Sequence, residues 1–226
     1  MHFDSYTYLW PPRPEKAIPP TMLSYYESKG WLAQIKLNGT CNVLAVNPER
    51  HIVAMSRHKE PHKLWTPNAD SERAFAHLPG NGWYVFVAEL LHSKVADPGL
   101  KNINYIHDML VADGEMLNGS AYQARLDFLY ALFSRHIDAQ EQPDSISHTV
   151  IDANTWLAKS HCSGLAILGG TMMGDFEKLF AETAKHKEME GLVLKDPEAK
   201  LKLCVKADSN SAWQVKCRNP SKAYSF

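Results

Sequence analysis

A lysine near the N-terminus lies where it could act as a nucleophile. Residues 36–39, Lys-Leu-Asn-Gly, separate two apolar runs, 31–35 and 43–46, that are typical of buried strands. Asn-Gly between such runs is a strong turn signal, because both residues tolerate a positive φ. A lysine held at a strand end, away from bulk water and near other cations, has a lowered pKa and becomes a nucleophile. A hairpin with a solvated lysine beside its turn is the simpler hypothesis, and the tetrapeptide alone favours it.

Glu89 is a second candidate, because it interrupts an apolar strand. Residues 83–91 are largely aromatic or β-branched and give the strongest strand signal in the sequence. A charge inside such a strand costs free energy unless it is paired or faces a wet cleft. The alternative is an outward position on a half-exposed sheet, which strand alternation makes ordinary.

More charged residues lie in or beside strand signals near the C-terminus. Residues 189–195 run from Glu190 through a glycine and three apolar residues to Lys195. Residues 213–218 alternate cleanly, which places Lys216 and Arg218 on one face of a strand. Two cations on one face usually form a solvated edge, but the same pair is suited to binding phosphates.

The elements that would position these residues are strands mixed irregularly with helices. Strand signals cover residues 31–56, 83–91, 103–111, 191–194, 202–205 and 213–217, and helix signals cover residues 21–29, 71–78, 122–133, 152–159 and 175–187. Hairpin turns between neighbouring strands favour an α+β fold over a doubly wound sheet. We expect the proline-rich residues 1–20 to form an extended arm on a single domain that covers residues 1–226.

Composition indicates a soluble, intracellular protein. The chain has 226 residues, of which 45% are hydrophobic and 22% charged, as in globular domains. Its formal net charge of −1 excludes a global field that attracts nucleic acid or acidic membranes, but not a local basic groove. The four cysteines are scattered without a CxxC pair or a zinc spacing, which suits reduced thiols in the cytosol. No apolar run approaches membrane-spanning length, and no signal-peptide pattern opens the chain.

Several segments, taken in order, resemble the motifs of one enzyme superfamily. They are residues 36–39, 56–57, 86–91, 105–110 with 113–114, 190–195 and 216–218. The set resembles motifs I to V of the covalent nucleotidyltransferases, which comprise ATP- and NAD-dependent polynucleotide ligases and GTP-dependent mRNA capping enzymes. Each motif is weak alone, but the ordered set is specific and spans nearly the whole chain. The resemblance implies an α+β nucleotidyltransferase domain of mainly antiparallel sheets flanked by helices.

The resemblance also implies a role for each residue. Lys36 would form a phosphoramide bond to AMP from ATP, assisted by the cations Lys195, Lys216 and Arg218. Glu190, which has no neutralising partner in the sequence, would bind Mg²⁺ or Mn²⁺. The nucleotide-binding residues would be Gln34 at the adenine edge, Glu89 at the ribose, and Asn38, Gly39, Arg57, Tyr105 and His107.

The same resemblance implies that the partner is a nucleic acid with 5′-phosphate and 3′-hydroxyl ends, and not a membrane. The sequence departs from the family pattern at residues 40–42, Thr-Cys-Asn, which are closer to the RNA-ligase form than to the DNA-ligase form. His107 stands where the family usually has an aromatic residue that stacks on the purine. The chain ends eight residues after Arg218, so we expect no C-terminal OB domain, and a partner protein could replace it.

An ATP-dependent polynucleotide ligase is the leading hypothesis, with RNA slightly favoured over DNA as the substrate. The alternatives are a GTP-dependent capping guanylyltransferase and a non-catalytic module that binds nucleotide or nucleic acid. A decayed module should have lost some of the charged motif residues, and this sequence has all of them.

Overall fold

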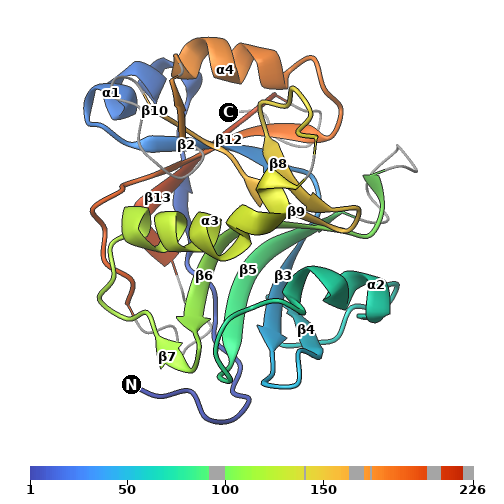
Figure 1. The fold of residues 1–226 in the computed structure, drawn as a ribbon. Coiled ribbons are helices and arrows are strands. Elements are labelled where there is room, and N and C mark those ends of the chain that lie inside the picture. Colours follow the sequence, from blue (N-terminus) through green and yellow to red (C-terminus); the bar gives the residue numbers. More distant parts are fainter. Residues whose placement is uncertain (92–99, 140, 163–170, 174, 203–209, 221–226) are drawn as a thin grey trace.

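Two β-sheets form the framework of the molecule, and helices cover the outer face of each (Figure 1). The computed structural model describes the whole chain except residues 92–99, 140, 163–170, 174, 203–209 and 221–226. Strands and helices alternate irregularly along the described residues, so the predicted α+β class is confirmed.

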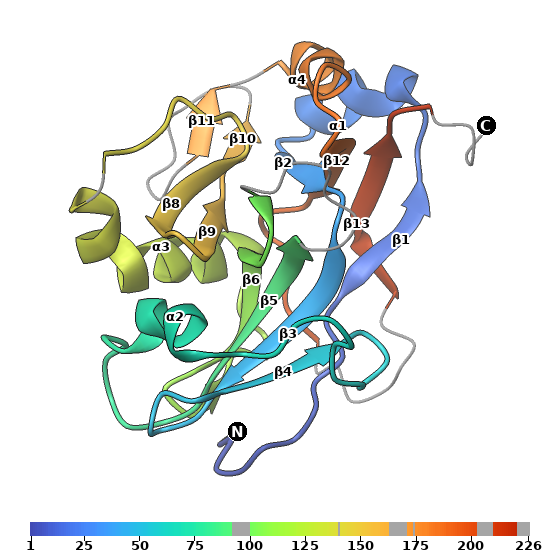
Figure 2. The ribbon, with the colours of Figure 1, turned by 90° about the vertical axis from the view of Figure 1, so that its right-hand side faces the viewer.

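The first sheet has six strands and contains the first and the last strand of the described chain. Its order is β1 (Arg13–Ala17), β13 (Asn210–Arg218), β12 (Met189–Lys195), β2 (Leu32–Leu37), β10 (Ser160–Cys162) and β11 (Thr171–Met173). β1 runs parallel to β13, as Figure 2 shows, and β10 runs parallel to β11. The pairings that join β2 to β10 and β12, and β12 to β13, are antiparallel.

The second sheet has seven strands and contains the strand with the strongest sequence signal. Its order is β4 (Ile52–Ser56), β3 (Thr40–Val46), β5 (Tyr84–Leu91), β6 (Ile103–Ala112), β9 (Thr155–Ala158) and β8 (His148–Asp152), and β7 (Glu115–Met116) pairs with β6. β6 and β9 are parallel, and the other neighbours are antiparallel.

Each sheet has its own helices. A 3₁₀ turn (Pro20–Met22), α1 (Leu23–Ser28) and α4 (Phe176–Thr183) lie over the six-stranded sheet, and α2 (Ala69–Glu72), a 3₁₀ turn (Arg73–Phe75) and α3 (Tyr122–Asp138) lie over the seven-stranded one. Local signals set the starts of two helices. The Asp175 carboxylate accepts from two backbone N–H groups of α4, and Asn68 forms a capping box with Ser71 at the start of α2.

Successive side chains along each strand point alternately to the hydrophobic core under the helices and to the face between the two sheets. On β2, Ala33, Ile35 and Leu37 pack into the core beneath α1 and α4, whereas Gln34 and Lys36 point to the opposite face. On β13, Val215 and Cys217 face that core, and Lys216 and Arg218 face away from it. On β5, Phe86, Ala88 and Leu90 pack beneath α3, and Glu89 points away from them. The inner faces of the two sheets therefore carry the polar residues.

One predicted helix is wrong. Residues 152–159 form the end of β8, a turn and β9. The Asp152 carboxylate accepts from the Asn154 backbone N–H, at 2.8 Å from Oδ1 to N, and this turn takes the place of the helix start that these residues suggested. The aromatic and β-branched residues that follow then pair with β6. Of the predicted strand over residues 202–205, Lys202 lies in no regular element, and the others fall outside the described residues.

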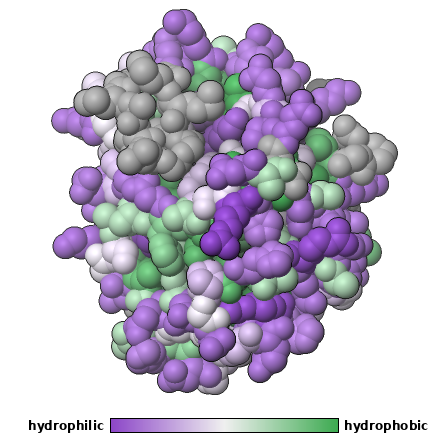
Figure 3. All heavy atoms as spheres, viewed as in Figure 1, coloured by the Kyte–Doolittle hydropathy of each residue, from purple (hydrophilic) through white to green (hydrophobic). Residues whose placement is uncertain are grey.

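The face of the molecule seen in Figure 3 is mostly hydrophilic, but hydrophobic residues gather over α3. Phe128 of α3, at 42% exposure, is one of few large apolar side chains that the described surface exposes. No helix in the described part of the chain is long and apolar enough to span a membrane.

Candidate functional site

A cavity of about 600 Å³ lies between the inner faces of the two sheets. Residues 10–15 of the N-terminal segment also line it. The predicted site residues on its wall are Gln34, Lys36, Arg57, Glu89, Tyr105, His107, Lys195, Lys216 and Arg218. Residues separated by up to 184 positions in the sequence (34 to 218) thus meet in one place. Asn38, Gly39 and Glu190 do not line the cavity, although Gly39 and Glu190 contact residues that do.

Lys36 forms an ion pair with Glu190 at the edge of the cavity. A bulge in β12 places Glu190 there, because the pairing register with β2 shifts between Met189 and Gly191. Gly191 has φ +128°, and a side chain at this position would collide with the backbone of Cys217. Arg218 approaches the same oxygen of Glu190, with 3.9 Å between Nε and Oε2. The sequence alone gave Glu190 no neutralising partner, whereas the structure pairs it with Lys36 and places Arg218 nearby.

Glu89 lies next to Lys36 and is held by the turn that follows it. The Gly39 N–H donates to Glu89 Oε1 at 3.2 Å. A Cβ atom at Gly39 would approach the Leu90 carbonyl oxygen to 2.6 Å, so only glycine fits between β2 and β5. Burial raises the pKa of Glu89, although Lys36 and Arg57 act against this. Its carboxyl group is therefore a strong acceptor for hydroxyl donors in the cavity.

The cations of the cavity repel one another. Burial lowers the pKa of Lys216, and the nearby Arg218, Lys36 and Arg57 lower it further. Such a group of like charges is relieved by an anion placed among them. The inner face of β2 and β13 is therefore suited to a phosphate chain.

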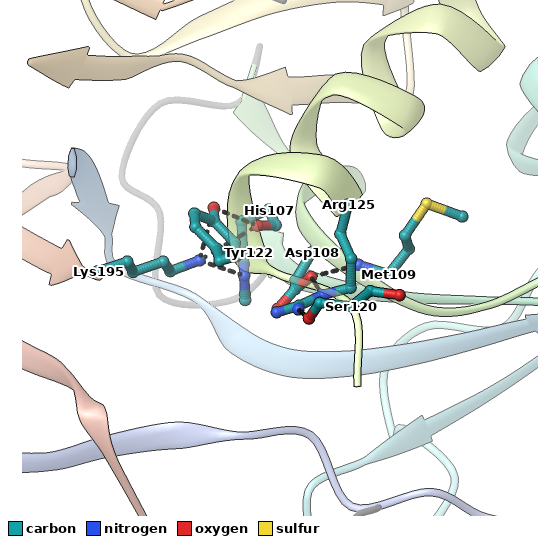
Figure 4. A network of polar contacts seen from close by, with 7 residues as sticks. All are labelled: His107, Asp108, Met109, Ser120, Tyr122, Arg125 and Lys195. Carbon is teal, nitrogen blue, oxygen red and sulfur yellow. Dashed lines mark hydrogen bonds and ion pairs between the residues drawn. The ribbon is translucent and has the colours of Figure 1, made fainter. Parts of the chain in front are cut away.

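Lys195 is buried behind these cations and is held by β6 and α3 (Figure 4). Its Nζ donates to the His107 carbonyl oxygen and to the Tyr122 hydroxyl, both at 3.1 Å. It also lies 4.5 Å from the centroid of the Tyr122 ring, within range of a cation–π interaction. Burial, the largest effect, lowers the pKa of Lys195 to about 7.

A buried ion pair between α3 and β6 lies beside this network. Arg125 of α3 donates from Nε and Nη2 to the two carboxylate oxygens of Asp108, at 2.8 and 3.0 Å. Burial alone would raise the pKa of Asp108, but the Arg125 charge outweighs it and holds the pKa below its usual range. The pair fixes α3 against β6, which are the elements that hold Lys195 (Figure 4).

Comparison with solved structures identifies the fold. Mycobacterial DNA ligase D complexed with ATP and MES is 18% identical with a TM-score of 0.56, over 92% of this chain and 60% of that one. The ligase domain of LigD from M. tuberculosis is 17% identical with a TM-score of 0.55, over 92% of this chain and 60% of that one. The ATP-dependent DNA ligase from bacteriophage T7, in complex with ATP, is 11% identical with a TM-score of 0.53, over 92% of this chain and 68% of that one. The chain has the fold of a DNA ligase domain.

The chain spans about 60% of the length of the two LigD chains. No family model and no curated protein matches its sequence. The similarity to DNA ligase domains is therefore seen in the structure, and it agrees with the order of the motifs along the sequence.

Some predicted site residues form hydrogen bonds with the protein's own backbone. The Asn38 backbone N–H donates to the Glu188 carbonyl at 2.8 Å, and its side chain lies outside the cavity wall. Tyr105 lines the cavity, but its hydroxyl lies 3.1 and 3.0 Å from the Ile35 and Ser147 carbonyl oxygens, which share its single proton. His107 is partly buried, and desolvation is the main cause that lowers its pKa to about 3, so its imidazole is neutral.

Sequence analysis missed several residues of the cavity. Gln214 lies on the same face of β13 as Lys216, so the alternation that singled out Lys216 could have found it. Trp10 and Arg13 belong to the proline-rich segment, which was interpreted only as an arm. Tyr122 does not line the cavity but contacts Lys195, which does; it resembles any core residue of an amphipathic helix, and no sequence signal connects it with Lys195.

The segment that favoured RNA over DNA lies mostly away from the cavity. Cys41 lines the wall, but the buried Asn42 does not. The Asn42 amide donates to Asn104 Oδ1 at 2.9 Å, and its oxygen lies 3.0 Å from His62 Nε2. Asn42 therefore contributes to the joint between β3, β6 and the loop after β4.

The residues present fit a magnesium ion bound mainly by a nucleotide. Among the described residues, no group of three or more His, Cys, Asp or Glu side chains is placed to hold a metal. Mg²⁺ does not need such a group, because it commonly binds one or two carboxylates together with substrate phosphates. Glu190, beside the cations of the cavity, is the carboxylate suited to this role.

Proposed function

We propose that this protein is an ATP-dependent polynucleotide ligase in which Lys36 carries AMP as a covalent intermediate. One observation supports the proposal above the others. A single cavity brings the Lys36 amine together with three further cations, Lys195, Lys216 and Arg218, and with the acceptor Glu89. The similarity of the fold to DNA ligase domains supports the same proposal, and it does not depend on which residues line the cavity.

In the first step, the Lys36 amine attacks the α-phosphorus of ATP. A phosphoramide N–P bond forms and the bond to the β-phosphate oxygen breaks, so that pyrophosphate leaves. Lys36 must first lose a proton, and the adjacent Glu190 carboxylate, while it binds no metal, is the base within reach. Negative charge then develops on the phosphoryl oxygens, where Lys216, Arg218 and Lys195 would stabilise it.

The remaining predicted residues would orient the nucleotide. Glu89 would accept hydrogen bonds from the ribose hydroxyls, and Gln34 would contact the edge of the base. Tyr105 and His107 offer rings on the cavity wall for the purine. Magnesium, when bound with the nucleotide at Glu190, neutralises phosphate charge.

AMP would next pass to a 5′-phosphate, and a 3′-hydroxyl would displace it to seal the strand. We do not assign RNA or DNA from residues 40–42, because Asn42 binds Asn104 and His62 rather than facing the cavity. Nicked duplexes with matched sequences, one in DNA and one with RNA at the nick, would identify the preferred substrate.

The test is covalent labelling with ATP or GTP that carries ³²P in the α-phosphate, followed by denaturing electrophoresis. We expect labelling by ATP and its loss in Lys36→Ala. Lys185→Ala is the matched control, because Lys185 also pairs with a glutamate, Glu182, at 2.6 Å, but on the exposed surface.

Each outcome selects one hypothesis. Labelling by GTP alone would favour a capping guanylyltransferase, and labelling by neither nucleotide would favour a binding module. Labelling of Lys36→Ala at the wild-type level would exclude Lys36 as the nucleotide carrier.

A further inference from the structure

Trp10 in the N-terminal segment is a cavity residue that the proposed function does not use. It lines the wall and is partly exposed, so it lies where the cavity opens to solvent. Tyr8 packs against it edge-to-face, with 4.9 Å between the ring centroids and 85° between the ring planes. This geometry lets Tyr8 cover only one face of the indole. Trp10 therefore brings a large aromatic surface to the opening of the cavity.

Contacts with β4 hold the Trp10 ring in place. Tyr8 is 4% exposed, and its hydroxyl donates to the Ser56 carbonyl at 2.8 Å. Ser56 is the last residue of β4, so this hydrogen bond ties the N-terminal segment to the end of that strand. A side chain that is already held loses little conformational freedom when a ligand packs on it. Trp10 is therefore preorganised for stacking.

Exposed basic residues follow β4 at the same place. Arg57 and His58 are exposed and line the cavity, and Lys59 is the next exposed residue. Burial raises the pKa of Tyr8, and the Arg57 charge is close enough to oppose this shift. Burial is the main cause of the lowered pKa of Lys216, and the Arg57 charge adds to it. Arg57 therefore lies near both the aromatic pair and the cations of the cavity.

An aromatic ring beside exposed cations is typical of sites that bind a single nucleic-acid strand. A base stacks on the ring, and the cations bind the phosphates. In the proposed reaction the 5′-phosphate must approach AMP on Lys36 from outside the cavity. The nucleotide that bears this phosphate then lies farther out, at the opening where Trp10 and Arg57 meet solvent.

We propose that Trp10 stacks on the terminal base of the strand that carries the 5′-phosphate, and that Arg57 and Lys59 bind the phosphates of that strand. This inference rests on the proposed function, and it assigns the second substrate to the N-terminal segment and the end of β4. A base at a closed nick has a neighbouring base on each face, which leaves no face for Trp10. The site therefore takes a strand whose 5′ end is unpaired.

Equilibrium binding of single strands of DNA and of RNA, measured by fluorescence anisotropy without ATP, tests the stacking. Each pair of strands carries a 5′-phosphate and differs only in the terminal nucleotide, which has a base in one strand and is abasic in the other. Wild type should bind the intact strand at least about tenfold more tightly, because stacking on an aromatic side chain contributes strongly to the affinity for single strands. In Trp10→Leu, which keeps an apolar contact with Tyr8, the ratio should fall toward one.

Two further variants separate stacking from other effects. Trp83→Leu is the matched control, because Trp83 is also partly exposed and packs edge-to-face on Phe3, at 5.9 Å between centroids, but does not line the cavity. It should keep the wild-type ratio. Arg57→Gln should weaken the binding of both strands and reduce its dependence on salt, and it should leave the ratio unchanged, because a cation binds the phosphates and not the base.

A ratio near one for wild type with both DNA and RNA would overturn the inference, whether or not any variant folds. An unchanged ratio in Trp10→Leu, an equal fall in Trp83→Leu, or tighter binding of a closed nick than of the unpaired strand would also overturn it. Base-dependent binding without covalent labelling by ATP would overturn the proposed function and leave the stacking role of Trp10 standing. Covalent labelling without base-dependent binding would do the reverse.

Discussion

Lys195 holds its amine where water scarcely reaches it, since the residue is 2% exposed. Burial lowers its pKa from about 10.5 to about 7, Asp108 acts against this shift, and Arg125 acts with it. The groups in contact with Lys195 do not titrate in the same range. Burial lowers the pKa of His107 to about 3 and raises that of Tyr122 well above 10. Near neutral pH, Lys195 is therefore the group of this network that changes its charge.

This shift makes the stability of the protein depend on pH. Below pH 7, Lys195 is charged in both the folded and the unfolded state, so the folded state bears the full cost of the buried charge. Between about pH 7 and 10 the unfolded chain binds more protons at this residue, so stability rises with pH. Relative to Lys195→Met, wild type should gain roughly 2 kcal/mol between pH 7 and pH 9.

Urea unfolding of wild type and Lys195→Met at several pH values would measure this difference. The difference between the two free energies of unfolding isolates Lys195 from other titrating groups. A difference that stays constant from pH 7 to pH 9 would contradict the lowered pKa of Lys195.

At the residue scale, sequence could predict the charged members of the site but not the residues that hold them. Lys195, Lys216 and Glu89 were conspicuous because a charge in an apolar strand needs a reason. Ser160 and Tyr122 are ordinary in their own segments, and only the pairing of β10 with β2 and the packing of α3 bring them to Gln34 and Lys195.

Helix α3 is joined to β6 by the Asp108–Arg125 pair, whose side chains are 3% and 0% exposed. Removing one partner of such a pair leaves a buried charge without a counter-ion. Arg125→Met should therefore lower the free energy of unfolding by about 3–5 kcal/mol. The double variant Asp108→Asn with Arg125→Met should recover part of this loss, because it leaves no unpaired charge.

Denaturant unfolding of the single and double variants would test the pair, with Arg73→Met as the control. Arg73 also pairs with an aspartate, Asp70, at 2.6 Å, but both side chains are well exposed. Its loss should cost much less, because water screens exposed pairs. Equal losses from Arg73→Met and Arg125→Met would mean that burial adds nothing to the pair.

At the element scale, sequence prediction succeeded where one signal dominated and failed where two signals competed. Residues 83–91 were predicted as a strand and form β5, Tyr84–Leu91, because aromatic and β-branched residues run through the segment. Residues 152–159 combine polar turn residues with Thr-Trp-Leu-Ala, and a helix was predicted. The partner strand β6, which was not visible from the local sequence, favours the β9 conformation instead.

The whole molecule encloses its cavity with parts from the entire chain. Residues 10–15 line it at one end of the sequence and Lys216 and Arg218 at the other, and β1 and β13 pair side by side (Figure 2). The net charge of −1 gives no hint of the cations gathered inside. Sequence could order the motifs along the chain, but the meeting of the two sheets required the structure, because it depends on long-range pairing.

The N-terminal segment is part of this framework, and its packing can be tested at Leu9. Leu9 is 4% exposed and lies in the apolar cluster that contains Phe3 and Tyr8, beside the residues that line the cavity. Leu9→Ala removes buried methyl groups and leaves a cavity, so it should lower the free energy of unfolding by about 2–5 kcal/mol. Leu64→Ala makes the same change at a position that is 74% exposed, and it should have little effect on urea unfolding. If the two variants unfold at the same urea concentration as wild type, the segment is not packed against β3 and β5, and the cavity cannot depend on it.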